Sequence, residues 1–399
     1  GYWALVDTHN LLWQMSLKLK HQHLAVDPSN DSLYVVRSVS NAWSSREISD
    51  EVYRGGILSA LWDEKTHASI LTRQSVRLDG YVYTTNYESH DVFGYPRVST
   101  QSSSYPSENG SRITQYNYRN DIAGWFLGLP ESERVLQDGV ANGVISRSYG
   151  DTGLLLSETR FGVPIVYDYT NEGDLLSATD ARGHTTTYSD YYRGIAQLEM
   201  RADGSRLSRV VDPQGVVAAR TSGRGHTTAF TYDGLNRLVG IEFPVGADVS
   251  VSWNDSGKVL TRGDYRESVQ WDGFGREVRL ARSDLSSGIS YVVNYRYDFL
   301  GRRVFASNVN SAQGVLQDYD VIGRLQRVIN QDGSDRAITY EGAHRELHRD
   351  ESGNVVEYLH QVYGSPSQRF LSWVIAPEGV ATRIARDAYG NILSVFQGG

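Results

Sequence analysis

Apolar and polar residues alternate with a period of two along most of the chain. Clear examples are TTAFTY at 227–232, SVSWN at 250–254 and ISYVVNYRY at 289–297. Such alternation places successive side chains on opposite faces of a β-strand, whereas the helical period near 3.6 is almost absent. Only NLLWQMSLKLKHQHL at 10–24 could be argued as a helix, and its own alternation favours a strand. The pattern predicts an all-β protein.

An eight-residue phrase separates these strands. It reads YDGLNRLV from 232, WDGFGREV from 271, YDFLGRRV from 297 and YDVIGRLQ from 319. Asp at the first position of a type I turn can accept a hydrogen bond from a backbone N–H two or three residues later, and Gly at the fourth accepts the positive φ of a bulged hairpin. The phrase therefore predicts a β-hairpin whose structural residues are Tyr232, Asp233, Trp271, Asp272, Gly275, Tyr297, Asp298, Gly301, Tyr319, Asp320 and Gly323.

Looser copies of the phrase extend the array. They begin at 149, 169, 211, 253, 349 and 386, and the successive turn positions are Gly153, Gly173, Gly215, Asn236, Gly257, Gly275, Gly301 and Gly323. We therefore expect a hairpin array over 149–399, degenerate copies of it over 80–148, and a β-rich N-terminal part over 1–79. The Ser-rich STQSSSYPSENGS at 99–111 is the best candidate for a loop or linker.

Composition narrows the possible functions. The chain contains no Cys, which excludes disulfides, thiolate nucleophiles and Cys-based metal sites. A net charge of −8 without clustered Lys and Arg argues against a nucleic-acid partner. No apolar run approaches the roughly 18 residues of a membrane span. Because the chain starts at Gly1 without a Met or a leader, we expect a piece of a longer protein.

The repeated phrase resembles the RHS/YD-repeat family, whose namesake pairs correspond to Tyr232–Asp233, Tyr297–Asp298 and Tyr319–Asp320. The resemblance covers 149–399 and, less strongly, 80–148, where WFLGLPESERV at 125–135 looks like the start of such arrays. It implies a spiralling β-sheet that forms part of a hollow shell, as in bacterial polymorphic toxins, the B and C components of insecticidal toxin complexes, and teneurins. In the bacterial members the shell encloses a toxic polypeptide.

The resemblance also implies partners and a location. We expect a toxin polypeptide or further shell segments of the same parent protein as partners, in a secreted, cell-surface or secretion-system-delivered bacterial protein. Toxin-carrying members close the array with an autoprotease segment containing a DPxGL-like element; the chain ends at RDAYGNILSVFQGG without one, so no cleavage site is predicted. A sheet shorter than a full shell would present open edges, which favours association with neighbours.

Few residues suggest chemistry. His344, Glu346 and His348 in HRELH would share one face of a strand and could form a two-His, one-carboxylate metal set. Ligands two residues apart are splayed by roughly 7 Å on a straight strand, so a solvated polar face is the favoured interpretation. His184 and His226 recur in the GHTT sub-phrase, and the repeated Asp residues precede a turn Gly, so both sets are interpreted as structural. No cofactor is predicted.

Two alternatives stay open. Tyr, Trp and Arg on a concave β-surface suit sugar stacking and carboxylate pairing, which would fit a carbohydrate-binding module or a polysaccharide lyase that uses a Tyr or His as base. The family resemblance leaves open a glycan- or receptor-binding adhesion protein of the teneurin type. Against glycan binding and lyase activity, Tyr232, Tyr297 and Tyr319 recur at the repeat period, which is typical of packing residues. The favoured interpretation is a structural, non-enzymatic shell segment.

Overall fold

The computed structural model describes residues 20–26, 33–47, 67–108, 110–137 and 140–398. These residues form 31 β-strands. The strands are β1 (Lys20–Val26), β2 (Leu33–Glu47), β3 (His67–Leu78), β4 (Tyr81–Glu88), β5 (Val98–Ser103), β6 (Arg112–Asp121), β7 (Phe126–Gln137), β8 (Val140–Tyr149), β9 (Leu155–Arg160), β10 (Val163–Tyr169), β11 (Leu175–Thr179), β12 (Thr185–Tyr192), β13 (Ile195–Met200), β14 (Arg206–Val211), β15 (Val217–Thr221), β16 (Thr227–Tyr232), β17 (Leu238–Glu242), β18 (Val249–Asn254), β19 (Gly257–Arg262), β20 (Tyr265–Trp271), β21 (Glu277–Asp284), β22 (Ser290–Tyr297), β23 (Arg303–Ser307), β24 (Gly314–Tyr319), β25 (Leu325–Ile329), β26 (Asp335–Glu341), β27 (Arg345–Arg349), β28 (Val355–Gln361), β29 (Phe370–Ile375), β30 (Ala381–Arg386) and β31 (Ile392–Gly398).

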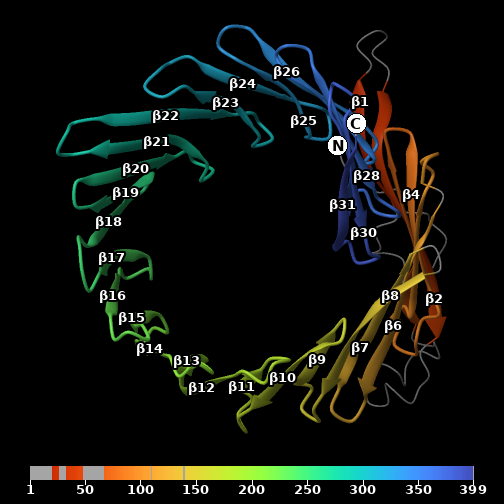
Figure 1. The fold of residues 1–399 in the computed structure, drawn as a ribbon, viewed down its shortest axis with the longest axis horizontal. Coiled ribbons are helices and arrows are strands. Elements are labelled where there is room, and N and C mark those ends of the chain that lie inside the picture. Colours follow the sequence, from red (N-terminus) through yellow and green to blue (C-terminus); the bar gives the residue numbers. More distant parts are fainter. Residues whose placement is uncertain (1–19, 27–32, 48–66, 109, 138–139, 399) are drawn as a thin grey trace, which may run out of the picture.

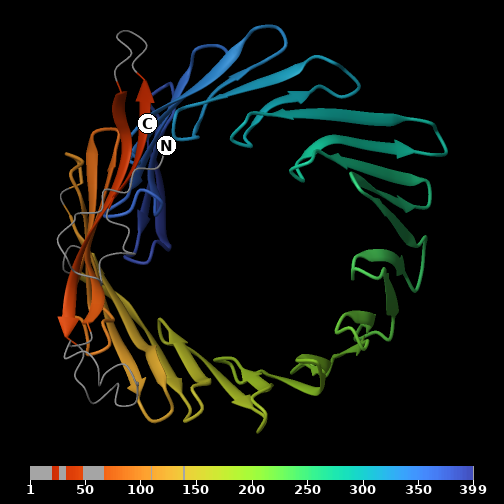
Figure 2. The same ribbon diagram turned by 180° about the vertical axis from the view of Figure 1, so that it is seen from behind.

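Each strand pairs antiparallel with its neighbours in sequence, so one continuous sheet runs from β1 to β31. The all-β hairpin array predicted from the alternation is confirmed. The ribbon curls into a ring, and no described segment crosses its middle (Figures 1 and 2). β3 pairs with β4 and β8 with β9, so the sheet continues across residues 79 and 148. The C-terminal strands (blue) lie on the inner side of the N-terminal strands (orange) in both views.

The hairpin turns of the phrase share one hydrogen-bonding pattern. In the turn 298–302, Asp298 Oδ1 accepts from the backbone N–H groups of Leu300 and Arg302, both at 2.9 Å, and Oδ2 accepts from Arg302 Nε at 2.6 Å. Gly301 has φ 81°, and the ladder register shifts between Arg296 and Tyr297, which forms a bulge. The carboxylate thus satisfies backbone donors that a tight turn would otherwise leave unpaired.

The phrase also ties each hairpin to the next. Tyr297 OH donates to the carbonyl of Glu277 at 2.7 Å, across the pair β21–β22. The Arg276 guanidinium lies 4.8 Å from the centre of the Tyr297 ring and donates to the carbonyl of Asp298 at 3.2 Å. The Arg of one turn therefore stabilises the aromatic residue and the turn of the following repeat, through a cation–π contact and a hydrogen bond.

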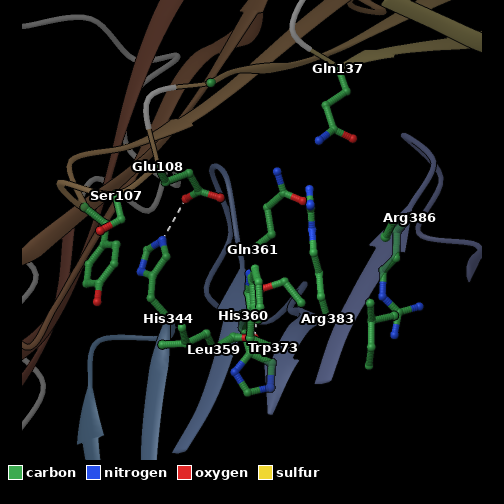
Figure 3. Close-up of a pocket in the computed structure, with 15 residues that line it drawn as sticks. Ser107, Glu108, Gln137, His344, Leu359, His360, Gln361, Trp373, Arg383 and Arg386 are labelled. Atoms are coloured by element: carbon green, nitrogen blue, oxygen red, sulfur yellow. Dashed lines mark hydrogen bonds and ion pairs between the residues drawn. The ribbon is translucent and has the colours of Figure 1, made fainter. Parts of the chain in front are cut away.

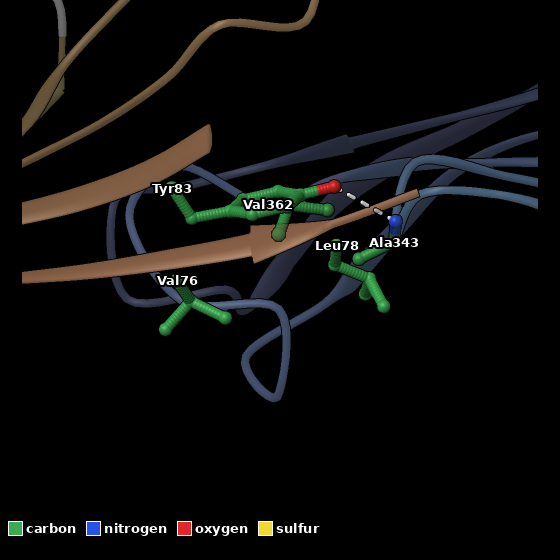
Figure 4. Packing of buried hydrophobic residues seen from close by; sticks show 5 residues of the cluster. All are labelled: Val76, Leu78, Tyr83, Ala343 and Val362. Atoms are coloured by element: carbon green, nitrogen blue, oxygen red, sulfur yellow. Dashed lines mark hydrogen bonds between the residues drawn. The ribbon is translucent and has the colours of Figure 1, made fainter. Parts of the chain in front are cut away.

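A single curled sheet buries little surface. The chain exposes 24912 Å², against roughly 15,600 Å² for a compact monomer of the same mass. The hydrophobic cluster lies where the two ends of the sheet overlap, and it joins Val76, Leu78 and Tyr83 of β3 and β4 to Ala343 and Val362 (Figure 4). The fold therefore gains its densest packing at the overlap rather than along the wall.

Local structure differs from the sequence-based prediction at two places, and a third prediction lies partly outside the described residues. The Ser-rich segment 99–111 is not simply a loop, because Val98–Ser103 forms β5, which pairs with β4 on one side and β6 on the other. Its Ser and Thr side chains are compatible with a strand that has neighbours on both sides. Gly257 pairs with Asn254 and starts β19, so it is not a turn residue of positive φ. It is glycine because a Cβ would lie 2.3 Å from the Val269 carbonyl oxygen. Of the segment 10–24, only 20–24 lies within the described residues, in β1.

Candidate functional site

The two ends of the sheet meet along a line of side-chain contacts that we call the closure seam. One side is formed by described residues between positions 76 and 161, and the other by described residues between positions 322 and 389. Its polar contacts are Asp79 with Arg324 at 2.7 Å, Tyr81 with Glu341 at 2.8 Å, Thr85 with the Gly364 carbonyl at 3.3 Å, Glu108 with His344 at 2.7 Å, Arg112 with the Ala388 carbonyl at 3.0 Å, and Tyr389 with the Glu133 carbonyl at 3.1 Å. These polar contacts join residues that lie between 236 positions apart, for Glu108 and His344, and 279 positions apart, for Thr85 and Gly364.

His344 lies at the centre of the seam and is only 2% exposed. Tyr83 OH accepts the backbone N–H of Ala343 at 2.8 Å, which directs its own proton to His344 Nδ1 at 3.1 Å. Nε2 of His344 is then the protonated nitrogen and donates to Glu108 Oε2 at 2.7 Å. The ring stacks on Tyr105, with centroids 4.0 Å apart and 5° between the planes.

Glu108 is buried beside His344 and all its bonds point into the seam. Oε1 accepts from the backbone N–H groups of Val362 at 2.8 Å and Tyr363 at 3.1 Å, and Oε2 also accepts from Ser103 Oγ at 2.6 Å. Burial by itself raises the pKa of this carboxyl, but the hydrogen bonds from His344, Ser103 and the two backbone groups outweigh it and lower the pKa. The carboxylate therefore holds the loop after β28 against the loop after β5.

Ser103, His344 and Glu108 superficially suggest a catalytic triad, but the geometry differs. Ser103 Oγ lies 3.3 Å from Nε2, the same nitrogen that Glu108 contacts, whereas a triad needs the carboxylate and the hydroxyl on opposite nitrogens. The second nitrogen faces Tyr83, whose pKa burial raises to about 12. The arrangement therefore differs from a catalytic triad and holds the three side chains against one another within the seam.

A cavity of about 500 Å³ opens beside the seam (Figure 3). Glu108 and Gln137 line one side, and the strands β28 to β30 line the other. Arg383 lies over the ring of Trp373 at 5.7 Å, and His360 carries a buried Nδ1 without a hydrogen-bond partner. Burial and then Arg369 lower the pKa of His360, which favours its neutral form. The lining could hold a planar or anionic group against Trp373 and Arg383.

The candidate metal set of His344, Glu346 and His348 does not assemble. His344 lies in the turn before β27 rather than on the strand, and it is buried, so the solvated polar face predicted for it was wrong. Glu346 and His348 bond to each other at 2.9 Å on β27, and Arg369 also contacts Glu346. The part of the chain that the structure describes holds no group of three His, Asp or Glu side chains arranged for a metal.

The remaining predicted residues occupy repeated structural positions. Asp233, Asp272 and Asp320 bind their turns as Asp298 does, and Asn236 takes positive φ in place of Gly. Tyr232 and Tyr319 donate to the carbonyls of Val217 and Arg303 in the preceding strand, as Tyr297 does to Glu277. Trp271 stacks on Trp253 at 6.0 Å. The side chain of His184 binds Asp180 of its own turn at 3.2 Å.

Sequence reasoning missed the residues that close the ring. Glu108, Tyr83 and Tyr105 sit outside the repeated phrase, and their partners lie more than two hundred residues away. One signal was present, because Glu108 is the only charged residue in the Ser-rich segment 99–111. A lone carboxylate among Ser and Tyr residues is a position worth testing for burial.

The fold and the seam define a single-sheet β-hairpin array whose ends overlap to form a continuous wall. No family model matches the sequence, and no curated protein matches it. The crystal structure of TcdB2-TccC3 aligns over 95% of this chain with a TM-score of 0.68 at 11% identity. The same complex without its hypervariable C-terminal region gives 0.69 at 10% identity over 95% of this chain, and TcdB2-TccC3-Cdc42 gives 0.54 at 12% identity over 91%.

The chain spans 29%, 31% and 21% of the lengths of those solved chains. At these identities the likeness is one of fold. It agrees with the all-β, spiralling hairpin sheet that the family resemblance implies, and the structural alignment covers almost the entire chain. The described residues contain no helix that is long and apolar enough to span a membrane.

Proposed function

We propose that this chain is a non-enzymatic segment of an RHS/YD-repeat shell that encloses or shields a polypeptide in a secreted bacterial toxin system. The observation that carries the proposal is the closure seam. The terminal strands β1 and β31 each pair with one neighbour, and the two ends of the sheet are joined by the contacts of the seam rather than by strand pairing. Overlapping the ends around the buried Glu108–His344 pair turns a strip into a wall with an inside and an outside.

The likeness to TcdB2-TccC3 supports a shell role, because it covers almost all of this chain. The described strands form a single sheet without a second layer over most of its length (Figure 1). The inner face of that sheet is therefore available to a guest polypeptide, which supports enclosure. The outward face would remain in contact with solvent. The further partners are the guest polypeptide and adjoining shell segments.

The side-chain chemistry favours a structural role over the lyase alternative. The hydroxyl protons of Tyr232, Tyr297 and Tyr319 are donated to backbone carbonyls, and burial raises the pKa of Tyr297. A tyrosine that must take a proton from a substrate needs a free oxygen and a lowered pKa. The repeat tyrosines therefore act as packing and hydrogen-bonding residues in this proposal.

Native mass spectrometry of the protein purified from its source tests the proposal. We expect a second polypeptide or additional shell segments to travel with the chain, and we expect added protease to degrade that polypeptide only after the seam is opened by Asp79→Asn with Glu108→Gln. A chain that is alone, monomeric and stable in that measurement, together with one chemical activity lost on a single substitution that leaves the fold intact, would contradict it.

A further inference from the structure

Three consecutive turns of the repeat touch one another along one edge of the sheet. They are the turns that start at Asp272, Asp298 and Asp320. Arg276 of the first donates to the Asp298 carbonyl at 3.2 Å, and Arg302 of the second donates to the Asp320 carbonyl at 3.1 Å. The three turns therefore form a continuous row rather than three separate loops.

This row presents apolar side chains to solvent. Phe274 is 85% exposed, Phe299 93% and Leu300 60%, and Val321 is also exposed. We call these four residues the apolar strip. Exposed apolar residues are ordinary when scattered singly, but a contiguous row of large ones is typical of an interaction surface.

The turn geometry does not require apolar residues there. In each turn the residue two positions after the Asp donates its backbone N–H to the carboxylate, whatever its side chain. That residue is polar in the equivalent turns at Arg182, Gln214 and Ser352, which make the same hydrogen bond at 2.9 Å. The apolar character of Phe274 and Leu300 therefore needs another reason.

Two other turns carry an apolar residue at this position and dock on another part of the sheet. Ile322 packs against the hydrophobic cluster of the closure seam. Tyr389 meets the edge of Phe161 with ring centroids 4.7 Å apart and donates to the Glu133 carbonyl. In these two turns the apolar residue docks on another part of the sheet, whereas Leu235 at the same position of its turn is 75% exposed, so we take docking as the role of this position where the turn lies next to the seam.

The Ile322 turn also shows the chemistry of its partner. The covering element is the hairpin of β3 and β4, which contributes Val76 and Leu78 to the cluster and places Asp79 at its tip. Asp79 accepts from Arg324 at 2.7 and 3.3 Å. Arg276 and Arg302 occupy the same position in their turns as Arg324 does in its own. The turns that carry the apolar strip therefore offer the same two features as the Ile322 turn, an apolar side chain and a nearby guanidinium.

We propose that the apolar strip docks a β-hairpin of an adjoining shell segment, with a carboxylate at its tip and aliphatic residues beside it. The strip is continuous with an established interface, because Val321 of the strip adjoins Ile322 of the seam. The inference rests on the proposed function, since it assigns the surface through which shell segments would join. The β3–β4 hairpin of a second copy is already engaged in its own seam, so a separate segment is the assigned occupant.

Binding of a cyclised peptide with the sequence of residues 74–85 to the intact chain tests this inference. We expect Phe274→Ser combined with Leu300→Ser to weaken binding about tenfold or more, because two apolar side chains lose their buried contact. Leu235→Ser is the matched control. Leu235 is an equally placed, exposed turn residue outside the row, and its substitution should change binding by less than about twofold. An Asp79→Asn peptide should bind more weakly than the parent peptide.

Equal binding to the wild-type chain and the double variant would overturn the inference. So would self-association of the wild-type chain that the double variant abolishes, because the occupant would then be a second copy. Neither result changes what we expect from the seam variants or from native mass spectrometry. Failure of the docking surface can therefore be distinguished from failure of the shell role.

Discussion

At the scale of single residues, the repeated turn Asp and the buried Glu108 both accept hydrogen bonds through a carboxylate. The turn Asp stabilises its own turn, whereas Glu108 joins segments that are distant in sequence. Each turn Asp gathers donors within five residues of itself, and its role can be predicted from the local phrase. Glu108 gathers donors from Ser103, His344, Val362 and Tyr363, most of them about 250 positions away. A local pattern carries no information on such contacts, which is why the turns were predicted and His344 was misjudged.

The turn Asp predicts a local loss of stability. Asp298→Ala removes the acceptor of two backbone N–H groups and should destabilise the hairpin by about 1–2 kcal/mol. Amide hydrogen exchange should rise at Leu300 and Arg302, while the unaltered turn at Asp272 keeps its protection. Gly301→Val, which forces a β-branched residue into positive φ, should cost a similar amount. Uniform loss of protection over the whole sheet would contradict a local role.

Glu108 predicts a dependence of the seam on pH. Its pKa is lower in the folded chain than its ordinary value of 4.5, so its stabilisation is complete above 4.5 and is lost as the pH falls through the lower folded value. Protection factors of the Val362 and Tyr363 amides should therefore fall on acidification. Glu108→Gln should lower them already near neutral pH. Glu267→Gln, which alters a carboxylate on β20 away from the seam, is the control and should leave them unchanged.

At the scale of elements, the hairpins were predictable because strand alternation and turn chemistry are both local. The structure departs from that prediction where a close approach matters more than a turn. Gly257 was assigned to a turn by analogy with the other copies, but it starts β19 beneath the backbone of β20. The Ser-rich segment was assigned to a loop because Ser is common in loops, yet β5 is held from both sides.

Gly257→Ala tests whether the close approach of the β20 backbone requires glycine at the start of β19. The new Cβ would lie 2.3 Å from the Val269 carbonyl oxygen, so β19 and β20 must separate locally, at a cost of about 1–3 kcal/mol. Gly273→Ala is the matched control, because nothing lies within 4 Å of a Cβ at that position. Chemical denaturation of both variants gives the comparison, and equal stability of the two would rule out the close approach.

At the scale of the whole molecule, the seam decides whether the sheet is a strip or a wall. No periodicity in the sequence indicates that β3 and β4 return to face β25 through β28, because the contact depends on the accumulated curvature of some twenty intervening strands. The resemblance of the repeated phrase to shell proteins predicted the curl. The residues that join its ends lie more than two hundred positions apart, so no local sequence pattern pairs them.

Comparing Arg324 with Arg302 distinguishes the contribution of the seam contact from that of the repeated turn contacts. Arg302 and Arg324 each bind their own turn Asp and lie over the next tyrosine, at 5.0 and 4.3 Å, but only Arg324 also reaches Asp79. Arg302→Met and Arg324→Met should therefore lose similar local stability. Only Arg324→Met should increase proteolysis at the seam. Equal cleavage of the two variants would show that the Asp79 contact contributes nothing to closure.

The central claim is that the two ends of one sheet lie against each other in solution. Because the chain has no Cys, Ser107→Cys with Ser367→Cys places one spin label on each side of the seam without further substitutions. Pulsed electron paramagnetic resonance should give a single narrow, short distance near neutral pH, and adding Glu108→Gln should broaden it. A broad distribution of long distances in the doubly labelled chain with Glu108 intact would mean that the sheet is an open strip, and the enclosing wall would have to be abandoned.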